Sequence, residues 1–310
     1  MRTLQLISNK SILTKELIKQ ITPPFLLTIY KIFRRRYGFF GVHSKYTDVL
    51  SEDPWSDKAW ISAQKEKLLQ LESSRDEKLF LPTPHLSNYL MIPCLFINLL
   101  SQEKTVNVLD HWGGTGLVYH YLYPYLSFPQ NVKWSVLDGP TLLEIGKEYT
   151  KKKTREKPDN PTKINFISDL QNASLEKFDI VYVNSSVQYY TDYQNNLHDL
   201  IALQPKYFIF TRLMSGEGKT FFCSQKIFTK HTPCCFINSW EFLEFFKKNG
   251  YDLIFKSPNK DEVYGRGSFH DREFKNVPEE YQTPFSIHMV FGKKELEVNS
   301  QKNIQNKKYN

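Results

Sequence analysis

The chain has 310 residues, of which 40% are hydrophobic and 15% aromatic. That is enough to bury one sizeable core beside an N-terminal accessory region, so one main domain is expected. The formal charge of +8 favours an anionic partner, but composition does not choose between nucleic acid, phosphorylated glycan and a membrane surface. The cysteines lack the paired spacings of a zinc site or a disulfide framework, and no metal is expected. They are Cys94, Cys223, Cys234 and Cys235.

The N-terminal segment is helical in pattern and becomes basic. Apolar residues at helical spacing predict a helix over residues 12–21, and the proline pair 23–24 ends it before a second helix that begins near Phe25. The second helix is apolar up to Phe33 and basic at residues 34–36. This pattern fits either packing on the domain or peripheral contact with the inner face of a membrane. No secretory signal is recognisable, so a cytoplasmic location is expected.

Residues 105–294 are expected to form the main domain, after a helical extension at 1–104 and before a disordered tail at 295–310. We expect the extension to cap the site or to help bind a substrate. Its predicted elements are an ordered aromatic loop at 37–46 and helices at 56–71 and 87–100, the latter kinked by Pro93.

From Thr105 onward, short β-branched runs alternate with helical stretches, which is typical of an α/β fold with a parallel sheet. The last two predicted strands have no helix between them, so we expect them to pair as an antiparallel hairpin. The basic run 151–157 falls between predicted elements and is expected to be a solvated loop. Strands are predicted at 106–110, 132–138, 163–167, 178–184, 207–211, 251–256 and 286–292, and helices at 116–126, 141–151, 193–203 and 239–249.

A strand that ends in an acid and runs into a glycine turn is the central motif. The segment VLDHWGGTG places Asp110 at the strand end and Gly113, Gly114 and Gly116 where a helix begins. Ligands of open α/β sheets bind at the carboxyl ends of strands, and glycines let a cofactor approach the backbone. The glycine turn alone is a weak signal. It also occurs in proteins that bind NAD and in many helix caps that bind no cofactor.

Acids also follow the next two predicted strands. Asp138 ends the second strand, where a carboxylate can accept hydrogen bonds from both hydroxyls of a ribose. Asp169 follows the third strand, at a place suited to the amino group of an adenine. Asn184 and Ser185 close the fourth strand with small polar groups. With Asp110, these strand ends predict one adenosine-binding cavity in a doubly wound α/β sheet.

Several segments together resemble a known family. VLDHWGGTG, WSVLDGP, NSSVQYY, FIFTRL, the stretch from SQKIF to TPCCF, and RYGFFG are similar to S-adenosylmethionine-dependent methyltransferases of bacterial surface-polysaccharide gene clusters. The resemblance covers about residues 21–292 and implies a class I methyltransferase (Rossmann-like) fold. It further implies a glycan or other small-molecule acceptor and no nucleic acid. The implied S-adenosylmethionine-binding residues are Asp110, Gly113, Gly114, Gly116, Asp138, Asp169, Asn184 and Ser185.

The sequence departs from that family after the motif acid. The two residues that follow it are usually an aromatic residue and a glycine, and here they are His111 and Trp112. A tryptophan lacks the ready access of glycine to positive φ. Either the loop takes an altered path or the cofactor binds poorly.

Methyl transfer to a hydroxyl benefits from a general base within about 3 Å of the acceptor proton, or one water away. His231 is expected in a loop after the fifth strand, above the same edge of the sheet. For the acceptor, Arg212 at the end of that strand could hold a carboxylate or phosphate, and Tyr190 could wall the pocket. A purely structural role is open for each candidate. The candidate bases are His111, His231, Tyr189 and Asp192.

Two other functions stay open at this point. A binding or scaffold protein that keeps the fold without transfer is favoured by Trp112 and by the absence of an evident base. A nicotinamide-dependent oxidoreductase is favoured by the glycine turn alone, and the antiparallel end of the predicted sheet argues against it.

Overall fold

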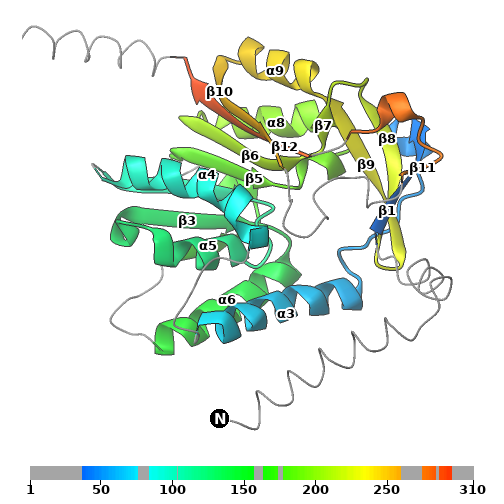
Figure 1. Ribbon diagram of the computed structural model, residues 1–310. Coiled ribbons are helices and arrows are strands. Elements are labelled where there is room, and N and C mark those ends of the chain that lie inside the picture. Colours follow the sequence, from blue (N-terminus) through cyan, green and yellow to red (C-terminus); the bar gives the residue numbers. More distant parts are fainter. Residues whose placement is uncertain are drawn as a thin grey trace, which may run out of the picture.

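The computed structural model describes residues 37–75, 84–102, 104–156, 163–173, 177–259, 274–283 and 286–294. They form two β-sheets, and helices cover the larger one (Figure 1). The predicted helices at 12–21 and from Phe25, the membrane contact at 25–36 and the tail at 295–310 lie outside these residues. In the part of the chain that is described, no helix has the length and apolar character needed to span a bilayer.

The main sheet has seven strands in the order β10-β12-β6-β5-β2-β3-β4. All are parallel except β12, which is antiparallel to both neighbours, so the predicted hairpin with β10 is confirmed. This order and its single reversed strand define the class I methyltransferase fold. The strands are β2 (Val106–His111), β3 (Val132–Leu137), β4 (Ile164–Ile167), β5 (Ile180–Asn184), β6 (Tyr207–Leu213), β10 (Tyr251–Pro258) and β12 (Ile287–Lys293).

Helices cover both faces of this sheet (Figure 1). One face carries α4 (Pro84–Ser101), α5 (Leu117–Leu122) and α6 (Pro140–Glu156), and α3 (Lys58–Arg75) lies against α5 and α6. The other carries α7 (Leu170–Ala173), α8 (Tyr193–Ala202) and α9 (Ser239–Lys248). The basic run from Lys151 was expected to be a loop, but it continues α6, where Lys153 bonds Glu156 at 2.9 Å.

A second sheet, which the sequence did not predict, has the order β11-β1-β8-β9-β7. Its centre is the hairpin of β8 (Phe221–Ile227) and β9 (Lys230–Asn238), inserted between β6 and α9. The expected loop at 37–46 is wrong, because β1 (Tyr37–His43) pairs antiparallel with β8 and buries Phe39 between the rings of Phe236 and Phe274. The remaining strands are β7 (Ser215–Gly216) and β11 (Phe274–Lys275).

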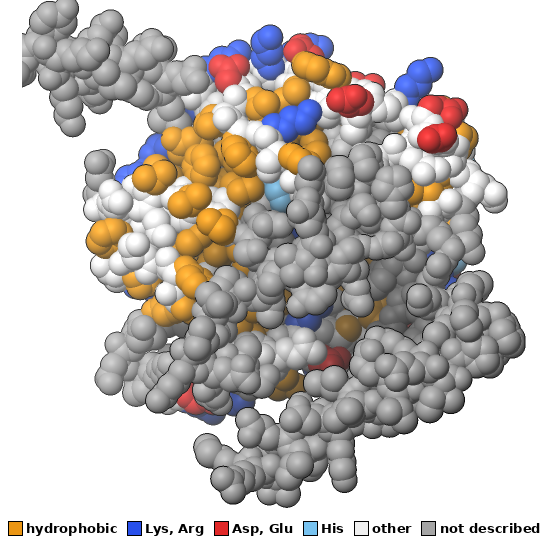
Figure 2. Space-filling model, in the orientation of Figure 1, with side chains coloured by type: hydrophobic (Ala, Val, Ile, Leu, Met, Phe, Trp, Pro, Cys, Tyr) orange, Lys and Arg blue, Asp and Glu red, His pale blue; other side chains and the backbone are white. Residues whose placement is uncertain are grey.

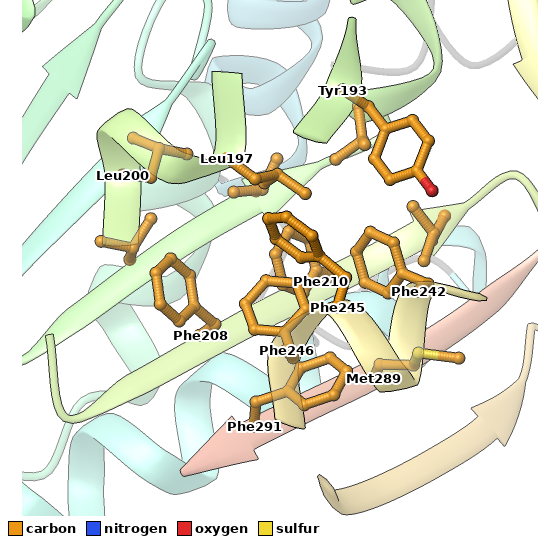
Figure 3. Close-up of a cluster of buried hydrophobic side chains, with 14 of the residues drawn as sticks. Tyr193, Leu197, Leu200, Phe208, Phe210, Phe242, Phe245, Phe246, Met289 and Phe291 are labelled. Atoms are coloured by element: carbon orange, nitrogen blue, oxygen red, sulfur yellow. The ribbon is translucent and has the colours of Figure 1, made fainter. Parts of the chain in front are cut away.

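An aromatic cluster fixes α8 and α9 to the sheet (Figure 3). Phe246 of α9 is fully buried and stacks on Phe291 of β12 with ring centroids 4.3 Å apart. Edge contacts of 5.1 and 5.2 Å join it to Phe208 and Phe210 of β6. The cluster therefore holds α8 and α9 against β6 and β12.

The outer side of α4 is apolar. Met91, Leu95 and Leu99 are more than half exposed and recur every four residues, so they form one stripe along the helix. Figure 2 shows hydrophobic side chains gathered on the face to which α4 belongs.

Replacing Phe246 with Ala should lower the free energy of unfolding by about 3–5 kcal/mol, because it removes a buried ring from between three others. Trp240→Ala in the same helix is the matched control, since that side chain is 66% exposed and should change stability by less than about 0.5 kcal/mol. Urea denaturation measures both. Equal losses in the two variants would contradict this account of the core.

Candidate functional site

A cavity of about 700 Å³ lies at the carboxyl ends of β2, β3, β5 and β6. Its walls are the turn after β2, the start of α6, the segment after β5, the end of β6, strand β8 and one side of α3. The volume falls in the range of roughly 300–1,000 Å³ that is usual for small-molecule sites. The site therefore lies where the fold predicts a ligand.

The turn after β2 keeps a left-handed path despite Trp112. Trp112 has a φ of 56° and donates its backbone N–H to the carbonyl of Leu137 at 2.8 Å. Such a conformation costs a residue with a Cβ roughly 1–2 kcal/mol. The indole is 48% exposed and lines the cavity wall, so it does not fill the space. The tryptophan thus adopts a left-handed conformation that glycine reaches more readily.

Asp138 joins the end of β3 to this turn. Its Oδ2 accepts the backbone N–H of Gly114 at 2.7 Å, and its Oδ1 accepts that of Gly139 at 2.6 Å. Burial raises the pKa of the carboxyl, and the two amide hydrogen bonds oppose that shift. Gly113, Gly114 and Asp138, three of the predicted cofactor-binding residues, all border the cavity.

Asp110 lies beneath the turn and does not border the cavity. It is fully buried, and its Oδ2 accepts the Nε1–H of Trp134 at 3.2 Å. No described residue donates to its Oδ1. Burial raises its pKa to about 7, Trp134 opposes the shift, and the charge of Asp138 adds to it. The predicted direct contact of Asp110 with a cofactor is therefore not supported, and the side chain supports the turn from below.

Glycine is required at two places in this turn by close packing. A Cβ on Gly113 would lie 2.4 Å from Cγ of Asp110. Gly116 has a φ of 72°, and its Cβ would lie 2.7 Å from Cδ1 of Ile164. Gly116, a predicted cofactor residue, is not part of the cavity lining, and it lets α5 pack closely on the sheet.

His111 and Tyr190 form a buried pair behind Trp112. Their contact joins the Tyr190 hydroxyl to His111 Nδ1 at 2.7 Å. Burial lowers the pKa of His111 to about 3 and raises that of Tyr190, so both side chains are neutral. Neither side chain borders the cavity, which argues against His111 as the base and Tyr190 as an acceptor contact.

Three more predicted site residues lie outside the cavity lining. Asp192 caps α8, and its Oδ1 accepts the backbone N–H groups of Gln194 and Asn195. Asp169 is exposed and its Oδ1 accepts the N–H of Gln171. His231, expected in a loop, lies in β9, where its Nδ1 is 2.9 Å from the hydroxyl of Ser224. Each of the three polar side chains therefore has a hydrogen-bond partner within the protein and needs no ligand to satisfy it.

The end of β5 and the end of β6 supply the remaining predicted residues. Asn184, Ser185, Tyr189 and Arg212 all border the cavity. Ser185, directly after β5, has a φ of 55°, and Arg212, the last residue but one of β6, has a φ of 54°, so the backbone is left-handed at both positions. The Oγ1 of Thr211 lies 3.0 Å from Oδ1 of Asn184 and joins the two strands. Of the four predicted catalytic residues, Tyr189 alone borders the cavity.

Aromatic rings of the N-terminal extension line one side of the cavity. Trp55 contacts the rings of Trp60 and Tyr189 with centroids 5.2 and 4.9 Å apart. On α3, Trp60, Gln64 and Lys67 face the cavity. The sequence signal that could have predicted this wall is the spacing of these three residues. Intervals of four and three residues put them on one side of the predicted helix.

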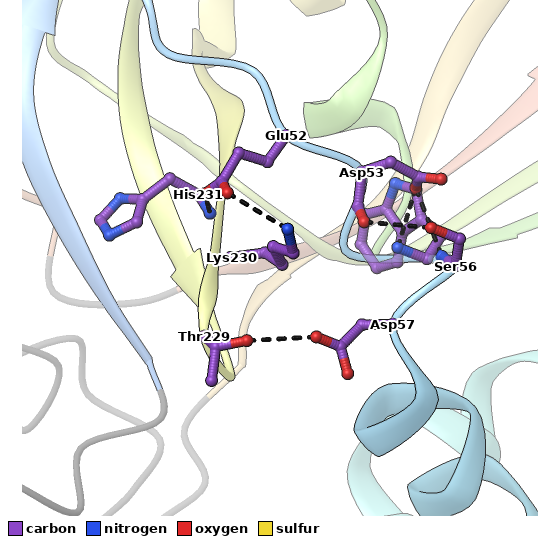
Figure 4. Close-up of polar contacts among 8 residues, drawn as sticks. Glu52, Asp53, Ser56, Asp57, Thr229, Lys230 and His231 are labelled. Carbon is purple, nitrogen blue, oxygen red and sulfur yellow. Dashed lines mark hydrogen bonds and ion pairs between the residues drawn. The ribbon is translucent and has the colours of Figure 1, made fainter.

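Polar contacts hold this extension against the hairpin of the second sheet (Figure 4). Glu52 accepts the backbone N–H of His231 at 2.6 Å and pairs with Lys230 at 3.4 Å. The N–H of His231 and then the charge of Lys230 hold the pKa of Glu52 below its usual value. Asp57 accepts the hydroxyl of Thr229 at 3.1 Å. The second sheet therefore positions the aromatic wall, and Gln225 and Ile227 of β8 reach the cavity themselves.

Comparisons with known proteins concern the fold. No protein-family model matches the chain, and no curated protein matches it. A solved 1,6-didemethyltoxoflavin-N1-methyltransferase from Burkholderia thailandensis is 11% identical, with a TM-score of 0.43, over 79% of this chain and 93% of that one. The magnesium protoporphyrin IX methyltransferase of Synechocystis has 12% identity and a TM-score of 0.45, over 76% and 96%. An S-adenosylmethionine-dependent methyltransferase from Clostridium acetobutylicum is 13% identical, with a TM-score of 0.41, over 76% of this chain and 98% of that one.

Gly113→Ala should destabilise the protein by about 1–3 kcal/mol, because the new methyl group would collide with the buried Asp110 carboxyl. Gly139→Ala is the control: this glycine also borders the cavity, and a Cβ there meets nothing within 4 Å. Thermal unfolding of both variants is the measurement. A Gly113 variant as stable as the Gly139 variant would show that the turn is looser than described.

Asp110 should make stability depend on pH. Its pKa is about 7 in the folded protein and about 3.9 when unfolded, so the unfolded chain ionises first as pH rises. Stability from this group is therefore present at low pH and is lost as pH rises from about 4 to about 7. Between pH 5 and pH 8, wild type should lose about 2–3 kcal/mol relative to Asp110→Asn, as measured by urea denaturation. A difference that is independent of pH would contradict the raised pKa.

Proposed function

We propose that this protein is a methyltransferase that uses S-adenosylmethionine and methylates a sugar, or a group linked to a sugar, in the synthesis of a bacterial surface polysaccharide. The observation that carries the proposal is the cavity in which the Asp138 carboxylate, Gly113 and Gly114 meet at the ends of β2 and β3. The polysaccharide part rests on the sequence resemblance alone, since fold does not determine the acceptor.

The residues at this end of the cavity fit an adenosine cofactor. Asp138 presents carboxylate oxygens, each with a further lone pair beyond its hydrogen bond to the backbone, to accept the two hydroxyls of a ribose. The Gly113–Gly114 backbone has no side chain to keep a ligand away. When bound, S-adenosylmethionine would supply an electrophilic methyl group. The chain supplies positioning, which can remove roughly 7–11 kcal/mol of a bimolecular barrier.

The acceptor would enter on the other side of the cavity, between the segment after β5 and the N-terminal wall. Trp55, Trp60 and Tyr189 offer flat apolar faces there, and Ser185 offers a small polar group. Amphipathic rings of this kind suit a sugar, which has apolar faces and polar edges. Tyr189 is the first candidate for the general base that removes the acceptor proton, because it borders the cavity.

A non-catalytic binding protein is the second candidate, and a specific observation favours it. His111, His231 and Asp192 are all held in local hydrogen bonds outside the cavity. Incubation with S-adenosylmethionine and extracted surface polysaccharide distinguishes the two functions. Release of S-adenosylhomocysteine that depends on the polysaccharide supports transfer, and binding without release supports the second candidate.

The sheet order, with β12 reversed, gives a nicotinamide-dependent oxidoreductase no support.

Asp138→Asn should weaken the binding of S-adenosylhomocysteine about 10-fold or more, because a charged acceptor of the ribose hydroxyls becomes a neutral amide. Asp169→Asn should leave the affinity unchanged, since that exposed side chain does not border the cavity. Isothermal titration measures both. Binding that is insensitive to Asp138, or absent in wild type, would count against the proposed cofactor.

A further inference from the structure

One side of β8 is buried and carries a single amide among apolar side chains. The buried residues alternate along the strand, and they are Phe221, Cys223, Gln225 and Ile227. Phe221 and Cys223 belong to the apolar cluster that forms the core of the second sheet. Gln225 is therefore the polar exception in an apolar row.

The Gln225 side chain borders the cavity, and its oxygen lacks a donor. The residue is 4% exposed. Among the described residues, none donates a hydrogen bond to its Oε1. Such an oxygen has given up its hydrogen bonds to water and lowers stability, whereas a methionine of similar length would carry no such cost. A glutamine at this position is thus explained better by a ligand in the cavity than by the fold.

Apolar side chains lie next to Gln225. Its cross-strand neighbours are Phe39 of β1 and Thr232 of β9, and Met214 packs in the same cluster as Phe39. Ile227 and Met214 are both 4% exposed, and both border the cavity. An acetamido group matches this combination, because its N–H and C=O can exchange hydrogen bonds with a carboxamide while its methyl group favours apolar contact.

This part of the wall is separate from the proposed cofactor site. Met214 directly follows β6, and Asp138 directly follows β3, three strands away in the order β3-β2-β5-β6. At about 4.8 Å between neighbouring strands, this separation is on the order of 14 Å. A cofactor with its ribose at Asp138 would therefore leave Gln225 to a second ligand. The rings of Trp60 and Tyr189 border the same cavity and offer flat faces to a sugar.

We propose that Gln225 determines acceptor specificity by binding the acetamido group of an N-acetylated amino sugar. The Gln225 carboxamide exchanges hydrogen bonds with the N–H and C=O of that group, and the acetyl methyl group lies against Ile227 and Met214. The assignment rests on the proposed function, because it takes the Asp138 end of the cavity for the cofactor. It narrows the acceptor to sugars that carry an amide.

The test uses two pairs of sugars as ligands of the full-length protein saturated with S-adenosylhomocysteine. N-acetylglucosamine is compared with glucose, and N-acetylgalactosamine with galactose, because each pair differs only in the acetamido group. Ligand-observed NMR titration should show at least one acetylated sugar binding about 10-fold or more tightly than its parent, the effect expected of two hydrogen bonds. Equal binding within both pairs by wild type would overturn the proposal.

Gln225→Met should abolish the preference, because the acetamido group would then be buried without partners, and it should leave the affinity for S-adenosylhomocysteine unchanged. Its melting temperature should equal or exceed that of wild type, since the substitution removes an oxygen that lacks a donor. An unchanged preference would contradict the assignment, and so would a lower melting temperature, which would give the amide to the fold.

Lys226→Met is the matched control. Lys226 is the next residue of β8, on the other side of the strand and outside the cavity lining, so this variant should keep the preference for acetylated sugars. Loss of the preference in this control as well would remove the assignment to Gln225. Failure of wild type to bind S-adenosylhomocysteine would instead overturn the proposed function.

Discussion

The hydrogen bond from the Gly114 N–H to the Asp138 carboxylate is the contact on which the site depends. It joins the turn after β2 to the end of β3, and so it fixes the path of the backbone along one side of the cavity. The buried Asp110 carboxyl supports the same turn from below, where no residue other than glycine fits at position 113. Two carboxyls thus hold one short loop, and the pKa of each is raised by burial.

The opposite side of the cavity is built from distant parts of the chain. The hairpin β8–β9 binds the segment around Glu52, and that segment leads into α3, which carries Trp60 and Lys67. The side that we propose for the cofactor is therefore made by the parallel sheet, whereas the side that we propose for the acceptor includes the insertion and the N-terminal extension. This division lets the acceptor change without any change in the sheet, as is common for folds that host many reactions.

Much of the fold could be predicted from the sequence, because buried parallel strands are short apolar runs between helical segments. β2, β3, β5 and β6 follow that pattern, whereas β12 is antiparallel and most of the edge strand β10 is exposed. The second sheet was missed, although β8 alternates buried and partly exposed residues from Phe221 to Ile227. The histidines could not be placed, since a sequence does not show that His111 binds Tyr190 or that His231 binds Ser224. Asp192 and Asp169 were taken for site residues because local turn contacts leave the same sequence signal.

We propose above all that the Asp138 end of the cavity is the adenosine site of a methyltransferase. A crystal structure of the protein grown with S-adenosylhomocysteine tests it most directly. We expect both ribose hydroxyls within hydrogen-bonding distance of the Asp138 carboxylate, with the indole of Trp112 still on the cavity wall. Electron density for the ligand elsewhere on the molecule, or a Trp112 side chain that occupies the ribose position, would contradict the claim.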